Sequence, residues 1–326
     1  MRIAFAYNVK SSLPSVDLDE QNDADFDSPE TVDKIKKTLE SLGHSVVMVE
    51  ANAEAFDKLK ELKSSIDIVF NIAEGLMGDA RESQIPMFCE VLGIPYTHSS
   101  PTTHAIKLDK EFTKLIVKGA EITNVPGHTK FPMIVKPNKE GSSKGIMDNN
   151  VVHNQEELDK KTKEISEKMG VEVLAEEYID GREFTVAVMG NENLTVLPIV
   201  EQRFDFLPAG MNKIASYELK WIYEDTLKDL TKAYDCPAKL DEKLKNEIEE
   251  VSKKIYTLLD VRDCARIDYR LDKDNNLYFI EINTLPGITP DAISYFPIAA
   301  YAAGMSYKDL VAKILSLACA RYGIKE

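Results

Sequence analysis

The chain has 326 residues, a length consistent with two or three domains. Hydrophobic residues make up 44% and charged residues 29%, which is typical of an ordinary soluble globular protein. The net charge of −15 argues against non-specific binding to nucleic acid or to an anionic membrane, because phosphate groups would be repelled overall.

The four cysteines are scattered and form neither a CxxC pair nor a metal-ligand spacing: Cys89, Cys236, Cys264 and Cys319. We therefore expect them to pack as small apolar side chains. The opening residues, MRIAFAYNVK, lack the apolar core and the cleavage site of a signal peptide. No stretch approaches the ~20 apolar residues that span a bilayer. These features predict a cytoplasmic protein with reduced thiols.

The first hundred residues alternate between strand and helix patterns. RIAFAY (2–7), SVVMVE (45–50) and IDIVFNI (66–72) are short apolar runs typical of strands. Residues 28–43 place apolar side chains on one helical face, behind a serine cap and a proline at the first helical position. This alternation predicts a parallel sheet flanked by helices. No GxGxxG follows the first strand, so no dinucleotide site is indicated.

The middle of the chain contains a glycine-serine loop between predicted strands. THAIKLDKEFTKLIVKGA (103–120) predicts one basic helix, and FPMIVKP (131–137) and EVLAEEYI (172–179) predict strands. Between them, KEGSSKG (139–145) could bring backbone N–H groups close to phosphate oxygens, because small residues permit that approach. A lone loop of this kind is equally consistent with a surface turn.

The last third, from about Arg182, combines strands with two long helices. A capping box formed by Ser306 and Asp309 predicts the start of the terminal helix. The expected elements are strands at 184–190 and 194–200, a helix at about 240–259, a hairpin at 266–287 and a helix at 306–318.

Polar side chains gather on one face of this hairpin. With the turn at 273–276, Asp272 is expected to face Leu277, so Asp268 faces Glu281 and Arg266 faces Asn283. The last four side chains then share one face. A solvated cluster of ion pairs is one explanation. However, carboxylates directly opposite each other are destabilising unless a cation lies between them, and oxygen ligands suit Mg²⁺ bound with phosphate. The other face is expected to enter a core: Ala265, Ile267, Tyr269, Leu271, Ile280 and Ile282.

These segments, in this order, resemble the ATP-grasp superfamily and, within it, the D-alanine–D-alanine ligase family. Four segments carry the resemblance across nearly the whole chain: VLGIPYTHSSPTTHAIKLDK, VKPNKEGSSKG, EEYIDGREFTVAVMGN and RID…EINTLPGIT. The resemblance implies an α/β (α+β) fold with a parallel-sheet substrate domain at 1–98, a central ATP-grasp subdomain at 99–181 and a C-terminal catalytic domain at 182–326. It also implies cytoplasmic peptidoglycan synthesis, small amino-acid substrates and a homodimer.

The resemblance implies a set of ATP-binding residues. Lysines hold the phosphates, the two serines of the loop cap them, and the segment 176–179 borders the adenine. Glu183 binds the ribose, and Lys220, followed by Trp221, belongs to a mobile loop. Structural alternatives are solvated lysines, a strand-end charge at Glu183 and a core position for Phe279. The full set is Lys110, Lys136, Ser142, Ser143, Glu176, Glu177, Tyr178, Ile179, Glu183, Lys220 and Phe279.

The resemblance also implies a metal site and a reaction. Asp268, Glu281 and Asn283 match the ligands of two Mg²⁺ or Mn²⁺ ions. Arg266 and the N–H of Gly287 match the groups that stabilise the tetrahedral intermediate, and Ser142 lies near the reacting carboxylate. In this family one carboxylate takes the γ-phosphate of ATP, and an amine then attacks the acylphosphate.

The donor pocket departs from the family pattern. The ligases carry a Gly-Gly-x-Ser-x-Glu segment after the first strand, and its glutamate anchors the ammonium of the first D-alanine. This chain has YNVKSSLPSVDLDEQ there, so Asp17, Asp19 or Glu20 is either a replacement or part of a solvated acidic loop. Further along, NIAEGLMGDARES replaces a His-Gly segment. In it, Glu74 could meet an ammonium group and Arg81 a carboxylate.

The acceptor pocket departs as well. The family has a serine after the glycine that corresponds to Gly287, and this serine holds the acceptor's carboxylate. Here the segment ITPDAISYFP is longer and contains Asp291, which would repel a carboxylate, whereas Ser294 could still serve.

The sequence therefore predicts a D-alanine–D-alanine ligase-like enzyme. The alternatives are a dipeptide ligase of L- or non-alanine specificity, a nucleotide-binding protein without ligase activity, and a kinase-like enzyme that stops at phosphoryl transfer.

Overall fold

The computed structural model describes residues 1–11, 15, 17–21, 23–208, 210–219, 227, 229–290 and 294–325, and only the backbone of Asp19 and Leu230. The N-terminal part is the predicted parallel sheet, with strand order β2-β1-β3. Its elements are β1 (Arg2–Tyr7), η1 (Leu18–Glu20), α1 (Pro29–Ser41), β2 (Ser45–Glu50), α2 (Ala55–Leu62), β3 (Ile68–Asn71), η2 (Arg81–Ser83) and α3 (Gln84–Leu92).

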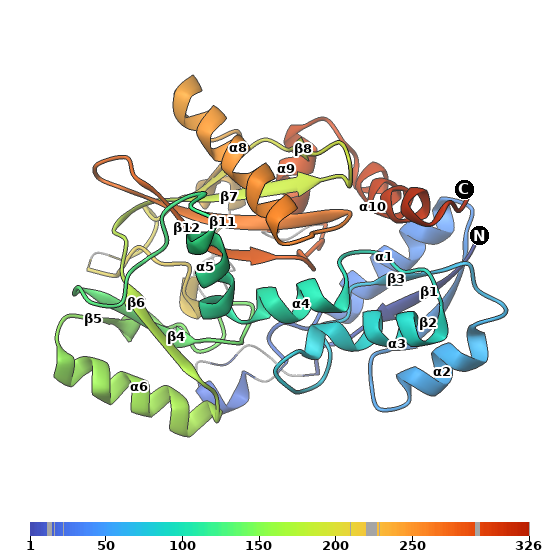
Figure 1. Cartoon of the computed structure of the whole chain (residues 1–326), viewed down its shortest axis with the longest axis horizontal. Helices are drawn as coiled ribbons and strands as arrows, with labels where there is room; N and C mark the ends of the chain where they lie inside the picture. Colours follow the sequence, from blue (N-terminus) through green and yellow to red (C-terminus); the bar gives the residue numbers. More distant parts are fainter. Residues whose placement is uncertain are drawn as a thin grey trace.

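The central part is a three-stranded antiparallel sheet of order β5-β4-β6, against which α6 packs (Figure 1). Apolar residues on one side of β4, including Met133 and Val135, meet Ile165 of α6 and form a small separate core. The elements are α4 (Pro101–Leu108), α5 (Lys110–Gly119), β4 (Met133–Pro137), η3 (Asp148–Asn150), β5 (Val151–Val152), α6 (Gln155–Met169) and β6 (Val173–Glu177).

The prediction of one continuous helix over 103–120 is wrong, because the helix breaks at Asp109. This residue is extended (φ −83°, ψ 100°), and its side chain accepts the N–H of Phe112 at 2.9 Å, which makes it the N-cap of α5. The carboxylate also accepts the side-chain amide of Asn138 at 3.0 Å. As a result, Lys107 lies in the last turn of α4 and Lys110 is the first residue of α5.

The C-terminal part is a six-stranded antiparallel sheet of order β10-β9-β7-β11-β12, with β8 paired to β7. The helix expected from about residue 240 starts at Glu242, where Asp241 caps it. The elements are β7 (Gly181–Met189), β8 (Thr195–Val196), β9 (Val200–Gln202), η5 (Leu230–Lys232), β10 (Tyr234–Asp235), α8 (Glu242–Leu258), β11 (Cys264–Asp272), β12 (Leu277–Asn283), α9 (Tyr295–Ala302) and α10 (Tyr307–Tyr322).

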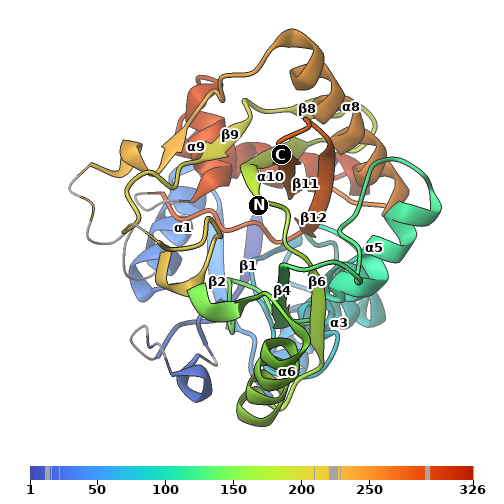
Figure 2. The same ribbon diagram turned by 90° about the vertical axis from the view of Figure 1, so that its left-hand side faces the viewer.

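Two apolar clusters hold the sheets in place. One lies between α8 and the sheet face of β7, β11 and β12. The other joins the N-terminal sheet and α1 to α9 and α10, so the first and last segments of the chain lie side by side (Figures 1 and 2). All four cysteines are free and pack in or against these apolar cores, as predicted. No helix in the described ranges is long and apolar enough to cross a membrane.

Asp263 links three parts of the fold from a fully buried position just before β11. Its carboxylate accepts the N–H of His98 at 2.7 Å and bonds Arg321 of α10 at 2.9 Å and Asn191 at 3.1 Å. We expect Asp263→Asn to lower the free energy of unfolding by about 2 kcal/mol, because an amide cannot accept all three bonds. Urea denaturation measures this loss.

The matched control is Asp260→Asn, which removes an exposed carboxylate paired with Arg262 and should change stability by less than about 0.5 kcal/mol. Equal midpoints for the two variants would contradict the structural role given to Asp263.

Candidate functional site

The hairpin β11–β12 has the predicted register at its polar end. Arg266 pairs with Asn283, and Asp268 pairs with Glu281. Beyond Asp268 a β-bulge shifts the register by one residue, so Leu271 rather than Asp272 faces Leu277. The predicted pairing of Asp272 was therefore wrong, because a bulge places an extra residue on one strand.

The bulge exchanges the expected orientations of Phe279 and Ile280. Phe279 is fully buried in the α8 core, where its ring lies 6.4 Å from that of Tyr269 in an edge-on contact. Ile280 is partly exposed and outside that core, so its predicted core position was wrong. Phe279 thus lies on the face away from Asp268, and nothing here supports its expected contact with adenine.

Each carboxylate on the polar face lies near a cation. Arg266 donates to Asp268 at 2.9 and 3.2 Å, and the Thr185 hydroxyl also donates to Asp268 at 2.8 Å. Glu281 lies 3.8 Å from the Lys110 ammonium and 3.9 Å from the Arg266 guanidinium. The two facing carboxylates are thus held by cations of the protein itself, as electrostatics requires.

These contacts fix the protonation of the cations. Burial alone would lower the pKa of Arg266, but Asp268 and Glu281 outweigh it and raise the pKa above the ordinary value. Burial lowers the pKa of Lys110, and Glu281 offsets this only in part. Arg266 is therefore a permanent charge beside the two carboxylates, whereas Lys110 is held in a less favourable environment that an anion would relieve.

The donor set of the hairpin fits a magnesium ion held together with phosphate. Asp268, Glu281 and Asn283 present carboxylate and amide oxygens from one face of two adjacent strands. In the part of the chain that the structure describes, no three His, Cys, Asp or Glu side chains gather into a complete metal cage. The remaining ligands would then be phosphate oxygens and water, which is usual for Mg²⁺.

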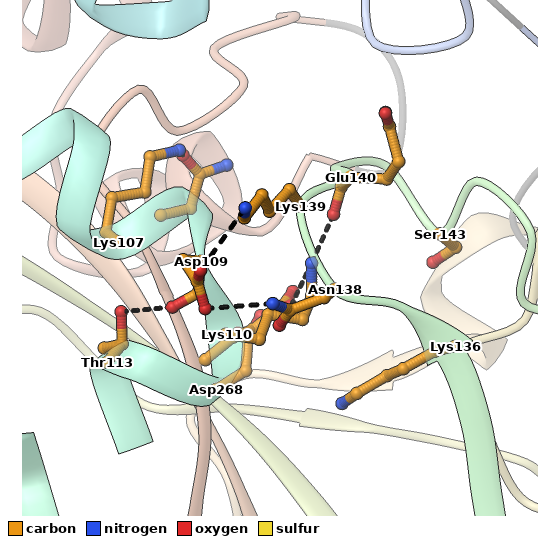
Figure 3. A network of polar contacts seen from close by, with 12 residues as sticks. Lys107, Asp109, Lys110, Thr113, Lys136, Asn138, Lys139, Glu140, Ser143 and Asp268 are labelled. Atoms are coloured by element: carbon orange, nitrogen blue, oxygen red, sulfur yellow. Dashed lines mark hydrogen bonds and ion pairs between the residues drawn. The ribbon is translucent and has the colours of Figure 1, made fainter. Parts of the chain in front are cut away.

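The glycine-serine loop has a backbone suited to an anion. Ser142 and Ser143 both have positive φ, 51° and 59°, and such consecutive left-handed residues turn successive N–H groups toward one point. The Lys110 ammonium donates to the Glu140 carbonyl at the start of this loop. Figure 3 shows Lys110 and Lys136 reaching toward the same region from α5 and β4, beside this loop.

A buried ion triad lies beneath this region. Glu176 of β6 is 1% exposed, and its carboxylate lies 2.5 Å from the Lys114 ammonium and 2.7 Å from that of Lys136. Burial would raise the pKa of Glu176, but the two lysines outweigh it and lower the pKa to about 2. The sequence did not single out Lys114, although it lies one helical turn after Lys110 on α5.

The predicted hinge joins the sheet of β4 to that of β7. The N–H groups of Glu177 and Tyr178 donate to the carbonyls of Gly127 and Pro132 at 2.7 and 2.9 Å, and partly buried Ile179 follows. These two backbone donors therefore hold the segment itself in place.

Arg270 is a central residue of the predicted nucleotide side that sequence analysis missed. Its guanidinium lies 5.3 Å from the centre of the Tyr178 ring and 3.4 Å from the carboxylate of Glu183, and it donates to the Lys213 carbonyl. The sequence feature that could have identified Arg270 is its position two residues after Asp268, because alternate residues of a strand share a face and this spacing places it on the polar face of β11.

Other predicted residues are placed as follows. Gly287 is exposed within the otherwise largely buried loop after β12, and its carbonyl accepts the Ser294 hydroxyl at 2.5 Å. Asp17 and Glu20 are exposed, which agrees with the solvated acidic loop. The residues Lys220, Trp221 and Asp291, and the side chain of Asp19, lie outside the part of the chain that the structure describes.

An ion-pair network that the sequence did not predict ties the N-terminal part to the phosphate loop. Arg81 bonds Asp25 and Glu140, each at 3.0 Å, and donates to the Lys139 carbonyl. Lys144 of the loop bonds the same two carboxylates at 3.0 and 2.8 Å. The two terminal nitrogens of Arg81 thus bond to two carboxylates and a carbonyl of the protein, and nothing here supports its expected contact with a substrate carboxylate.

Solved structures show the class of fold. A D-alanine–D-alanine ligase from Bacillus anthracis complexed with ATP matches with a TM-score of 0.71 and 22% identity, covering 100% of this chain and 99% of that one. The VanG D-Ala:D-Ser ligase from Enterococcus faecalis matches with a TM-score of 0.69 and 20% identity, covering 97% and 99%. The fold is that of the ATP-grasp ligases, as predicted.

Sequence comparison gives the family. The family model for the D-ala D-ala ligase C-terminus matches residues 101–316. The D-alanine–D-alanine ligase of Aquifex aeolicus is 33% identical over 295 residues, which are 86% of this chain and 92% of the relative. An uncharacterised protein of Sinorhizobium fredii is 32% identical over 307 residues, 89% and 88% of the two chains. The chain belongs to the D-alanine–D-alanine ligase family, and the prediction of the family is confirmed.

Proposed function

We propose that the chain is an ATP-dependent, ADP-forming ligase that joins the carboxylate of one small amino acid to the amine of another through an acylphosphate. The observation that carries this proposal is the polar face of the hairpin. It places Arg266, Asp268, Glu281 and Asn283 together, and Lys110 lies within 3.8 Å of Glu281. A domain that only bound nucleotide would not need Arg266 beside the metal donors.

The first step is phosphoryl transfer. A carboxylate oxygen of the donor attacks the γ-phosphorus, and the bond to ADP breaks. In our proposal Lys110, Lys136 and the N–H groups of Ser142 and Ser143 hold the phosphates, and the oxygens of Asp268, Glu281 and Asn283 hold one or two Mg²⁺ or Mn²⁺ ions. When bound there, the ion neutralises phosphate charge.

The second step is amide formation. The amine of the acceptor attacks the acyl carbon and forms the C–N bond. The tetrahedral oxyanion then collapses, the C–O bond to phosphate breaks, and phosphate leaves as HPO4²⁻ with the proton that the amine has lost. Arg266 keeps its charge beside this carbon, and together with the N–H of Gly287 it stabilises the oxyanion, while Ser142 lies near the carboxylate. Fixed charges aimed at a developing anion are the largest single contribution in many enzymes.

Exclusion of water is also required, because an acylphosphate hydrolyses. The segment before residue 220 lies on the phosphate loop: the Ser143 hydroxyl donates to the Ala215 carbonyl and the Tyr217 N–H to the Ile146 carbonyl, both at 2.7 Å. These contacts support a cover, formed by the segment around residues 215–217, that closes over the reacting groups.

The setting we propose is a cytoplasmic enzyme that acts on small molecules rather than on nucleic acid or membrane, consistent with its charge of −15. We also propose a homodimer. Met87 and Val91, one turn apart on α3, are 47% and 68% exposed, which supports an apolar contact there.

The experiment that tests the function is phosphate release from Mg-ATP with D- and L-amino acids, singly and in pairs, followed by mass spectrometry of the products. D-alanine is the default substrate, and a dipeptide of another composition would show that the altered pockets select other amino acids. A phosphoester product would instead show a kinase, and the absence of any product a nucleotide binder.

Arg266→Lys separates charge from geometry at the site. We expect kcat to fall about 100-fold with little change in the KM for ATP, because lysine keeps the charge but loses the planar fork that reaches both Asp268 and the oxyanion. Arg262→Lys is the control, because this arginine is partly exposed and pairs with the exposed Asp260. A variant as fast as the control would remove Arg266 from the mechanism.

A further inference from the structure

Glu74 follows β3 on a segment that the fold holds rigidly. The N–H of Gly75 donates to the side chain of Asn8 at 3.0 Å. Gly75 has a φ of +78°, and a Cβ on it would lie only 2.2 Å from the Arg81 carbonyl oxygen. Only glycine fits such a close approach, so the backbone from which the Glu74 side chain extends is fixed.

The charges around Glu74 are paired except for its own. Arg81 and Lys144 share Asp25 and Glu140, and Lys107 forms an ion pair with Glu82. Within the described ranges Glu74 makes no hydrogen bond or ion pair. The cluster therefore contains one more carboxyl group than it has cations.

The electrostatic environment of Glu74 agrees with a missing cation. Burial raises the pKa of its carboxyl well above the ordinary value, and the neighbouring carboxylates of Glu82 and Asp25 raise it further, against a smaller opposing effect of Lys107 and Arg81. A ligand with a positive charge would relieve this repulsion.

The cluster borders both halves of the proposed reaction. Lys107 donates to Asn283 of the metal face at 3.4 Å, and Arg81 reaches Glu140 at the start of the phosphate loop. In the proposed reaction, the carboxylate that attacks the γ-phosphate would lie between these two points. In an α-amino acid, the ammonium group stands on the carbon next to that carboxylate.

We infer that Glu74 anchors the α-ammonium group of the amino acid whose carboxylate is activated. The inference rests on the proposed function. It assigns to the segment after β3 the task that the ligases give to a glutamate after the first strand, which is absent here. Because the cations of the cluster are already paired with carboxylates of the protein, the donor is an α-amino acid with a free amine and without an acidic side chain.

Glu74→Gln tests the donor half alone when hydroxylamine replaces the acceptor and traps the acylphosphate as a hydroxamate. With D-alanine, or the most active amino acid of the panel, as donor, we expect the variant to raise the donor's KM roughly 30-fold with an ATP KM changed less than about twofold. Asp79→Asn is the control, since it removes an exposed carboxylate on the same segment, and it should leave both constants unchanged.

The hydroxy acid that corresponds to the donor gives a second readout. It carries no ammonium, so the wild-type chain should use it about 30-fold less well than the amino acid, and Glu74→Gln should abolish most of that preference. An equal loss on both donors would overturn the inference. Glu74→Ser gives the same comparison if the glutamine variant does not fold.

Failure of the inference and failure of the proposed function give different results. Wild-type chain that yields no hydroxamate and no ADP with any amino acid would overturn the proposed function and the inference together. If the wild-type chain is active and the Glu74→Gln variant has the same KM for the donor, only the role of Glu74 would be overturned.

Discussion

Glu281→Gln is expected to reduce Mg-ATP-dependent turnover about 1000-fold, because it removes a charge that phosphate-bound magnesium requires. Glutamine keeps the size of the side chain. In the structure Glu281 is one third exposed, and its two cations lie at 3.8 and 3.9 Å, so its ion pairs contribute little to stability. The melting temperature should therefore stay within a few degrees of the wild type.

Steady-state rates at several Mg²⁺ concentrations, together with thermal melts, check this expectation. Glu172→Gln is the matched control, because this glutamate is exposed and, among the described residues, forms an ion pair with Lys139 and with no residue of the hairpin. Near-normal activity of Glu281→Gln at low Mg²⁺ would refute the metal assignment, whereas loss of folding would make Glu281 a structural residue instead.

Glu176→Gln is expected to lower the free energy of unfolding by about 3 kcal/mol at pH 7, because it leaves two buried ammonium groups without their shared carboxylate. Lys114 and Lys136 lie 2.5 and 2.7 Å from that carboxylate, and all three side chains are buried. Glutamine has the same shape, so packing is preserved and the loss is electrostatic.

The pH dependence follows from the direction of each pKa shift. Glu176 has a pKa lowered from 4.5 to about 2, so its stabilisation is complete above its ordinary value and is lost as the pH falls toward 2. Burial lowers the pKa of Lys114 from 10.5 to about 7. Without Glu176 the pKa of Lys114 in the folded state should fall further below its ordinary value. Lys114 then has to lose its proton on folding over a wider pH range, which costs stability at pH values where the wild-type lysine stays charged.

The loss of stability should therefore be larger at pH 6 than at pH 8, as urea denaturation at both values can show. Glu164→Gln on α6 removes a carboxylate from a surface pair with Lys161 and should have an effect below about 0.5 kcal/mol at either pH. A loss at position 176 that does not depend on pH would show that the lysines stay charged by other means.

Local patterns in the sequence predicted much of the fold. Ser28 caps α1, and Ser306 with Asp309 forms the capping box of α10, because a cap depends only on residues within one turn. The pairing of Asp268 with Glu281 also follows from alternation along two strands joined by a short turn. Each of these predictions used information from one short segment.

The errors arise where a local pattern allows two outcomes. Asp109 can continue a helix or cap a new one, and its contact with Asn138, far along the chain, favours the cap. The bulge at Ile280 leaves no mark in the alternation of apolar residues. The ion pairs Arg81–Glu140 and Lys144–Asp25 join residues 59 and 119 positions apart, and no periodicity reports such contacts.

The break at Asp109 also has a consequence for how this enzyme could change its specificity. It separates Lys107, which pairs with Glu82 on the proposed amino-acid side, from Lys110, which donates to the Glu140 carbonyl on the proposed phosphate side. If Lys107 and Lys110 lay on one unbroken helix, a movement of that helix to accommodate a new amino acid would also displace Lys110 from the phosphates. With two helices, α4 can adapt to another substrate while α5 keeps its place, so the chain can evolve new donors without losing its use of ATP.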